Sequence, residues 1–235
     1  RYVWLAVGFA VISTPIPPFA AYYLKVGPQF SQGHIMLCEV LRYVGVMTAA
    51  WVIRRRIDEV GAKPFFLLAV GLYAGAGVLW WLFLQAGLGG TALVLLAYFA
   101  IGLGFAAWTI GNLHYLPNLL AEEERPLAIS IQGAVAAFCG GVAPIAWGLF
   151  LKSGERGARA IDVGVLQWFF ASVVGGGVVL WWLIARLPEA KGRPVDPISL
   201  GNAILRPIRA MTYLVNLVDP RPVRKDGEKL ECERD

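Results

Sequence analysis

The chain has 235 residues, of which 57% are hydrophobic and only 16% are charged, with a formal net charge of +5. Soluble domains are usually about 45–50% apolar and about 25% charged, so this composition indicates an integral membrane protein. It excludes a disordered chain, a disulfide-stabilised secreted domain and an ordinary soluble enzyme. The basic residues lie between apolar runs rather than in one soluble patch, which predicts a lipid bilayer and no nucleic acid as partner.

Six apolar runs are long enough to cross a bilayer, whose core about 30 Å thick requires about 20 mainly apolar residues per helix. They predict an all-α membrane protein with a six-helix transmembrane domain over 1–187. The runs occupy residues 2–24, 34–53, 64–85, 91–119, 127–151 and 163–186. Four tryptophans near the ends of runs are expected to anchor the spans at the interface: Trp80, Trp81, Trp181 and Trp182.

Lysine and arginine in the flanking segments predict the orientation of the spans. One side of the predicted bundle carries nine of them: Arg1, Arg54, Arg55, Arg56, Lys63, Arg125, Arg186, Lys191 and Arg193. The other side carries four: Lys25, Lys152, Arg156 and Arg159. Basic residues concentrate on the cytoplasmic side, so both ends of this multi-pass segment are expected there, in the cell's inner or plasma membrane.

The polar tail over 188–235 follows the last run. Within it, residues 198–218 place apolar side chains at helical spacing opposite a basic polar stripe, which predicts an amphipathic helix on the membrane surface. A tail without a role of its own is the alternative. At the other end, Arg1 enters an apolar run without a signal-peptide pattern, and we expect the chain to be part of a longer protein.

The segment between the second and third runs reads Ala49-Ala-Trp-Val-Ile-Arg-Arg-Arg-Ile-Asp-Glu-Val-Gly-Ala-Lys-Pro64. It resembles the cytoplasmic signature of the major facilitator superfamily, Gly-x-Leu-Ala-Asp-Arg-x-Gly-Arg-Lys. Asp58, Gly61 and Lys63 match the aspartate, the second glycine and the basic end, whereas three positions depart from the signature: Arg54, Arg56 and Glu59. Such departures are typical of the copy in the family's second half. A generic basic loop that only sets topology is the alternative.

The resemblance extends from Arg1 to about Arg186. Residues 138–148 are similar to the glycine- and proline-rich eleventh helix of the family, and residues 121–126 to the connection before it. The resemblance implies a bundle of two inverted three-helix repeats, the C-terminal half of a twelve-helix secondary transporter. It further implies a small-molecule solute moved by alternating access, a proton or sodium ion as coupling ion, and an N-terminal six-helix half as partner.

Ionisable residues inside a span indicate a functional site. Glu39 and Arg42 lie three residues apart in the second run, on one helix face, where Arg42 can hold an anionic or hydroxylated group and Glu39 can exchange a proton. An ion pair that only locks packing is the alternative. Two further polar residues lie about a turn inside their runs, where they line a cavity or bond another helix: Gln132 and Gln167.

Several residues are candidates for gating. Three prolines must break or kink the first run, which resembles the discontinuous seventh helix of the family at the outer gate: Pro15, Pro17 and Pro18. Tyr22 and Tyr23 follow near that gate. Asp58, Gly61 and Lys63 are candidates for the inner gate, as are two residues near the cytoplasmic end of the fourth run: Asn112 and His114. A static kink and a packing histidine are the alternatives.

The sequence lacks a P-loop, a His-Glu-x-x-His motif, a Gly-x-Ser-x-Gly elbow and a potassium-channel filter. Its two histidines and scattered cysteines predict no metal site and no cofactor, and we expect no enzymatic activity. The resemblance to the major facilitator superfamily implies a secondary transporter. The rival prediction is a stand-alone six-helix membrane protein with a structural or regulatory partner role.

Overall fold

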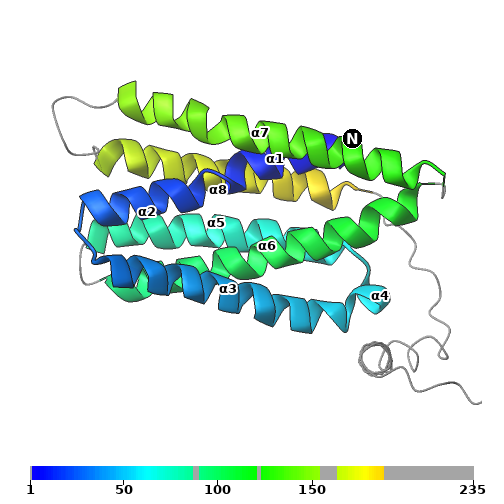
Figure 1. Cartoon of the computed structure of the whole chain (residues 1–235), viewed down its shortest axis with the longest axis horizontal. Coiled ribbons are helices and arrows are strands. Elements are labelled where there is room, and N and C mark those ends of the chain that lie inside the picture. Colours follow the sequence, from blue (N-terminus) through cyan, green and yellow to red (C-terminus); the bar gives the residue numbers. More distant parts are fainter. Residues whose placement is uncertain (1, 87–89, 121–122, 154–162, 188–235) are drawn as a thin grey trace, which may run out of the picture. The chain divides into compact units, whose positions relative to one another are not determined.

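The computed structural model describes residues 2–86, 90–120, 123–153 and 163–187, and the structural statements below refer to these residues. All their regular elements are helices: α1 (Tyr2–Ser13), α2 (Ile16–Val26), α3 (Gln32–Arg54), α4 (Ile57–Val60), α5 (Lys63–Ala86), α6 (Thr91–Leu119), α7 (Arg125–Ser153) and α8 (Val163–Ala185). Six segments are long and apolar enough to cross a membrane, α1 and α2 together forming the first (Figure 1). The predicted all-helical architecture with six membrane-length spans is confirmed, whereas the predicted tail helix over 198–218 lies outside the described residues.

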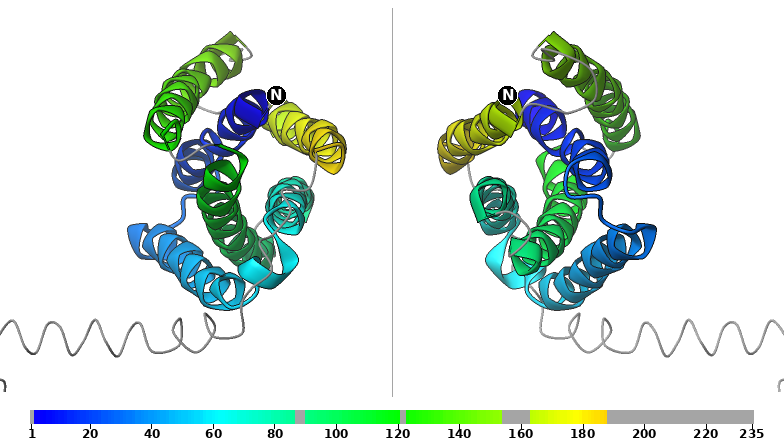
Figure 2. Two further views of the ribbon diagram at one scale, coloured as in Figure 1. Left: turned by 90° about the vertical axis from the view of Figure 1, so that its right-hand side faces the viewer. Right: turned by 90° about the vertical axis from the view of Figure 1, so that its left-hand side faces the viewer.

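Packing between neighbouring helices defines the bundle. α6 packs against α3 and α5, α5 packs against α8, and α1 packs against both α7 and α8. Viewed along the helices, α5 and α8 lie on one side, and α3 and α7 flank the opposite side with α2 and α6 between them (Figure 2). α3 and α7 are also the least buried spans, at 17% and 11% of their apolar windows. They therefore present large apolar faces to the outside of this six-helix unit.

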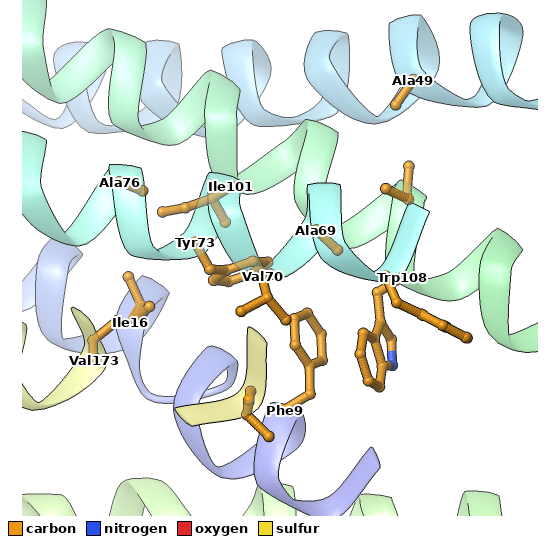
Figure 3. Packing of buried hydrophobic residues seen from close by; sticks show 14 of the residues in the cluster. Phe9, Ile16, Ala49, Ala69, Val70, Tyr73, Ala76, Ile101, Trp108 and Val173 are labelled. Atoms are coloured by element: carbon orange, nitrogen blue, oxygen red, sulfur yellow. The ribbon is translucent and has the colours of Figure 1, made fainter. Parts of the chain in front are cut away.

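Aromatic rings fill the core where α1, α5, α6 and α8 meet. The Phe9 ring stacks on the Trp108 indole with 3.9 Å between centroids and meets the Tyr73 ring edge-on at 5.0 Å (Figure 3). Such pairs contribute about 0.5–1.5 kcal/mol beyond the burial of their area. They fix α1, α5 and α6 relative to one another at mid-span.

Trp80 corrects one expectation from the sequence. It is fully buried and stacks on Phe170 of α8 with 5.2 Å between centroids, so the prediction that it anchors a span at the interface is wrong. Trp81, Trp181 and Trp182 are exposed. The physical reason is the contact between α5 and α8, which turns one tryptophan of the pair inward and leaves the next outside.

The first span is interrupted at mid-length, as its three prolines predict. α1 ends at Ser13, α2 begins at Ile16, and a turn joins them. Because a proline cannot donate a backbone hydrogen bond, the carbonyls four residues before each proline lack their usual helical donor. The three prolines therefore interrupt the helical hydrogen-bond pattern between α1 and α2.

Candidate functional site

Glu39 and Arg42 form an ion pair on α3. Arg42 Nε donates to Glu39 Oε2 at 2.7 Å, and Arg42 Nη2 lies 2.7 Å from the same oxygen. The side chains are 34% and 22% exposed, so the pair sits at the border between the buried and exposed faces of the helix. The Arg42 guanidinium also lies over the Tyr43 ring, 4.8 Å from its centroid. The arrangement can release a guanidinium to an anion whenever Glu39 takes up a proton.

Two glycines bring α6 against this pair. An added Cβ at Gly102 would overlap the Arg42 carbonyl, and one at Gly45 would overlap the Phe99 carbonyl. Small residues of this kind let helix backbones approach closely in a membrane. The backbone of Arg42 is therefore held directly against α6.

Tyr98 on α6 was not identified from the sequence as a site residue. It is fully buried, and its hydroxyl has no hydrogen-bond partner in the described part of the chain. Buried polar groups are normally paired, so this hydroxyl is an available donor on α6, the helix that packs against α3 and its ion pair. A lone tyrosine in an apolar run carries no sequence signal that separates it from a packing residue.

A second polar cluster joins three helices at the other end of the bundle. The Tyr2 hydroxyl donates to Asn112 Oδ1 at 2.6 Å, and Asn112 Nδ2 donates to Gln132 Oε1 at 3.3 Å. Gln132 is 5% exposed, and Tyr2 packs against the ring of Tyr115. The chain of bonds ties α1 to α6 and α6 to α7, and it directs the amide oxygen of Gln132 towards Asn112. Asn112 and Gln132 are candidates from the sequence alone, whereas nothing in the sequence distinguishes Tyr2 from an ordinary interfacial tyrosine.

Removing the first donor of this cluster tests its contribution to stability. Tyr2→Phe leaves Asn112 Oδ1 without its donor, and we expect a loss of about 1 kcal/mol in the free energy of unfolding. The matched control is Tyr22→Phe, because Tyr22 is 51% exposed; we expect it to change stability by no more than about 0.5 kcal/mol. Unfolding in detergent measures both, and equal effects would show that the cluster adds nothing.

The remaining candidates are dispersed along the bundle. Pro15 lies in the break of the first span, with Pro17 and Pro18 at the start of α2. Tyr22 is exposed, Tyr23 is half-buried, and Gln167 is half-buried on the first turns of α8. The His114 imidazole lies 3.5 Å from the amide nitrogen of Asn118, one turn further along α6. None of these joins the pair on α3 or the Tyr2–Asn112–Gln132 cluster through a hydrogen bond between described residues.

Three residues of the α3–α5 connection match the family signature, and the structure places them as follows. Gly61 has φ +81°, a left-handed conformation that favours glycine and ends α4. The Lys63 ammonium donates to the Leu187 carbonyl at 3.0 Å, which ties the start of α5 to the end of α8. Asp58 lies in α4, and its side chain is outside the described part of the structure.

No site for a metal ion emerges from the described residues, which contain no cluster of three histidine, cysteine or acidic side chains. Comparisons with protein-family models, curated proteins and solved structures found no match.

Proposed function

We propose that the chain is the C-terminal half of a secondary transporter of the major facilitator superfamily. On this proposal its six spans form two inverted three-helix repeats, and they move a small solute by alternating access, driven by a proton or sodium gradient. The N-terminal six-helix half supplies the other wall of the transport pathway.

The pattern of helix contacts supports the proposal most directly. In two inverted repeats, each of the first three spans corresponds to one of the last three. Here α1–α2 corresponds to α6, α3 to α7 and α5 to α8. The observed contacts follow this correspondence. The α3–α6 contact has its counterpart in α1–α7, the α5–α6 contact has its counterpart in α1–α8, and the α5–α8 contact corresponds to itself. The pairs α2–α3 and α6–α7 also exchange. Because an odd number of antiparallel steps separates the partners, each exchanged pair runs in opposite directions, as inverted repeats require.

The exposed side of the bundle supports a missing half as partner. α3 and α7 flank α2 and α6 on this side (Figure 2). Both helices expose large apolar residues, Met47 on α3 and Phe138 on α7 among them. On α7, Gly133 and Gly141 lie two turns apart with open space around them. Small residues at such positions favour a close helix–helix contact in a membrane.

The site residues take their roles from their places in the bundle. Glu39 and Arg42 lie on a flanking helix and are assigned to coupling or solute binding, with Tyr98 as an added donor. The proline break between α1 and α2 is assigned to the outer gate. At the end that carries most of the basic residues, Asp58 and the Asn112 cluster are assigned to the inner gate.

Two measurements on the natural protein test the proposal. We expect the intact polypeptide, extracted from its own membrane, to have a mass about twice the 25.6 kDa of this chain. Reconstituted in proteoliposomes with an imposed pH or sodium gradient, it should accumulate at least one solute from a mixed pool, with loss of accumulation when an ionophore collapses the gradient. A mass of 25.6 kDa together with gradient-independent solute content would contradict the proposal and favour a structural or regulatory six-helix protein.

A further inference from the structure

The hydroxyl of Thr14 lies at the break between α1 and α2, within hydrogen-bond distance of two carbonyls. Thr14 Oγ1 is 2.8 Å from the Ala10 carbonyl oxygen of its own helix and 2.9 Å from the Gly140 carbonyl oxygen of α7. A hydroxyl has one proton to donate, so only one of these carbonyls receives it at a time.

The two carbonyls differ in whether a backbone N–H already donates to them. The Ala10 carbonyl already accepts from the backbone N–H of Thr14 at 3.1 Å. The Gly140 carbonyl lies four residues before Pro144, inside α7, and a proline has no N–H to give it. Ser and Thr hydroxyls from neighbouring helices are a known way to satisfy carbonyls freed by proline in membrane spans. The proton of Thr14 is therefore assigned to Gly140.

Glycines on α7 allow the first span to lie close to it near the Thr14–Gly140 bond. A Cβ added to Gly140 would lie 3.1 Å from Thr14 Cγ2, so glycine leaves room for the threonine. Past the break, Phe19 of α2 lies against Gly148 of α7, where an added Cβ would be 3.8 Å from its ring. α7 thus contacts the first span on both sides of the break, and α1 is its main packing partner.

We propose that Thr14 supplies the hydrogen bond that Pro144 removes from α7, and so couples the break of the first span to the proline turn of α7. The two weakened segments then change conformation together rather than independently. The inference goes beyond the proposed function, since it concerns the mechanics of the bundle and holds with or without transport.

Hydrogen exchange in the full-length protein tests the coupling without any ligand. Thr14→Val keeps the shape and removes the donor, and we expect amide exchange in α7 just after Gly140 to rise about three- to twentyfold, the range given by interhelical hydrogen bonds in membranes. Labelling of the Cys139 thiol, resolved from that of buried Cys38 by peptide mass spectrometry, should rise in parallel. Thr48→Val is the matched control, because Thr48 Oγ1 donates to the Val44 carbonyl of its own helix at 2.8 Å and to no other group among the described residues. We expect it to leave α7 unchanged.

Pro144→Ala completes a double-mutant cycle. It restores an N–H at position 144 that can reach the Gly140 carbonyl, so Thr14→Val in this background should change exchange in α7 by less than about twofold. Unchanged exchange in Thr14→Val, or an equal effect in both backgrounds, would overturn the proposal. If Thr14→Val fails to fold, two single variants test the proposal instead. Amide exchange in α7 should match the wild type in Thr14→Ser and should be slower in Pro144→Ala. Faster exchange in Thr14→Ser, or exchange in Pro144→Ala that is not slower, would refute the coupling.

Discussion

Gly102→Ala is expected to destabilise the bundle more than a Gly→Ala substitution at any other described glycine. The new Cβ would overlap the Arg42 carbonyl and lie 3.1 Å from the Val46 nitrogen, both of them backbone atoms that no rotamer change can move. Overpacking a tight contact costs about 1–3 kcal/mol, and the upper end applies where α3 and α6 must separate as whole helices. Unfolding in detergent, followed by tryptophan fluorescence, should therefore show a loss near 3 kcal/mol.

A glycine in open space is the control for this effect. Gly75 on α5 has nothing within 4 Å of an added Cβ. Gly75→Ala should be neutral or stabilise the protein by up to about 1 kcal/mol, because alanine has the higher helix propensity. If Gly102→Ala were as stable as Gly75→Ala, the close contact between α3 and α6 would be refuted.

Exchanging the charges of the pair on α3 is expected to separate its packing role from its functional role. Arg42→Ala leaves the Glu39 carboxylate unpaired inside the span, and we expect gradient-driven transport to fall about 10- to 100-fold, as for loss of a charged hydrogen bond. In the double variant Glu39→Arg with Arg42→Glu an ion pair can form again. We expect folding to recover in it, but not transport.

The reason lies in what each position faces. In the exchanged pair the cation moves one turn along α3, away from the Gly102 contact with α6, so a solute or proton meets the wrong group. Uptake into proteoliposomes and detergent stability are measured on the same preparations. If the double variant recovered both transport and stability, the ion pair would only stabilise packing. If Glu39→Gln left the pH dependence of uptake unchanged, Glu39 would have no role in coupling.

The spans could be predicted from the sequence because each is a nearly continuous apolar run, and each helix begins and ends close to the residues where its run does. The break of the first span followed from the covalent structure of proline. Burial within a span was harder to predict. Trp80 and Trp81 are adjacent and chemically identical, and only the position of α8 decides that Trp80 is buried.

The candidate site was only partly accessible for the same reason. Glu39 and Arg42 stand out because charge inside a span is costly, and their spacing alone placed them on one face. Tyr2 bonds Asn112 and Thr14 bonds Gly140, and each partner lies more than a hundred positions away in the sequence. No local sequence pattern therefore identifies Tyr2 or Thr14 as a candidate. Gly102 became informative only when the backbone of α3 was seen against it.

The packing partners of α1 also bear on how the protein is made. Of the six spans described, the first to leave the ribosome packs mainly against α7 and α8, which are made last. Meanwhile α3, α5 and α6 can assemble with one another as soon as they are inserted. The first span, interrupted by its prolines, can therefore make its aromatic contacts with α5 and α6 early, but it completes its packing only when α7 and α8 have been made. Chains interrupted before α7 would leave α1 with its contacts to α5 and α6 but without α7 and α8, so one side of the first span would stay exposed.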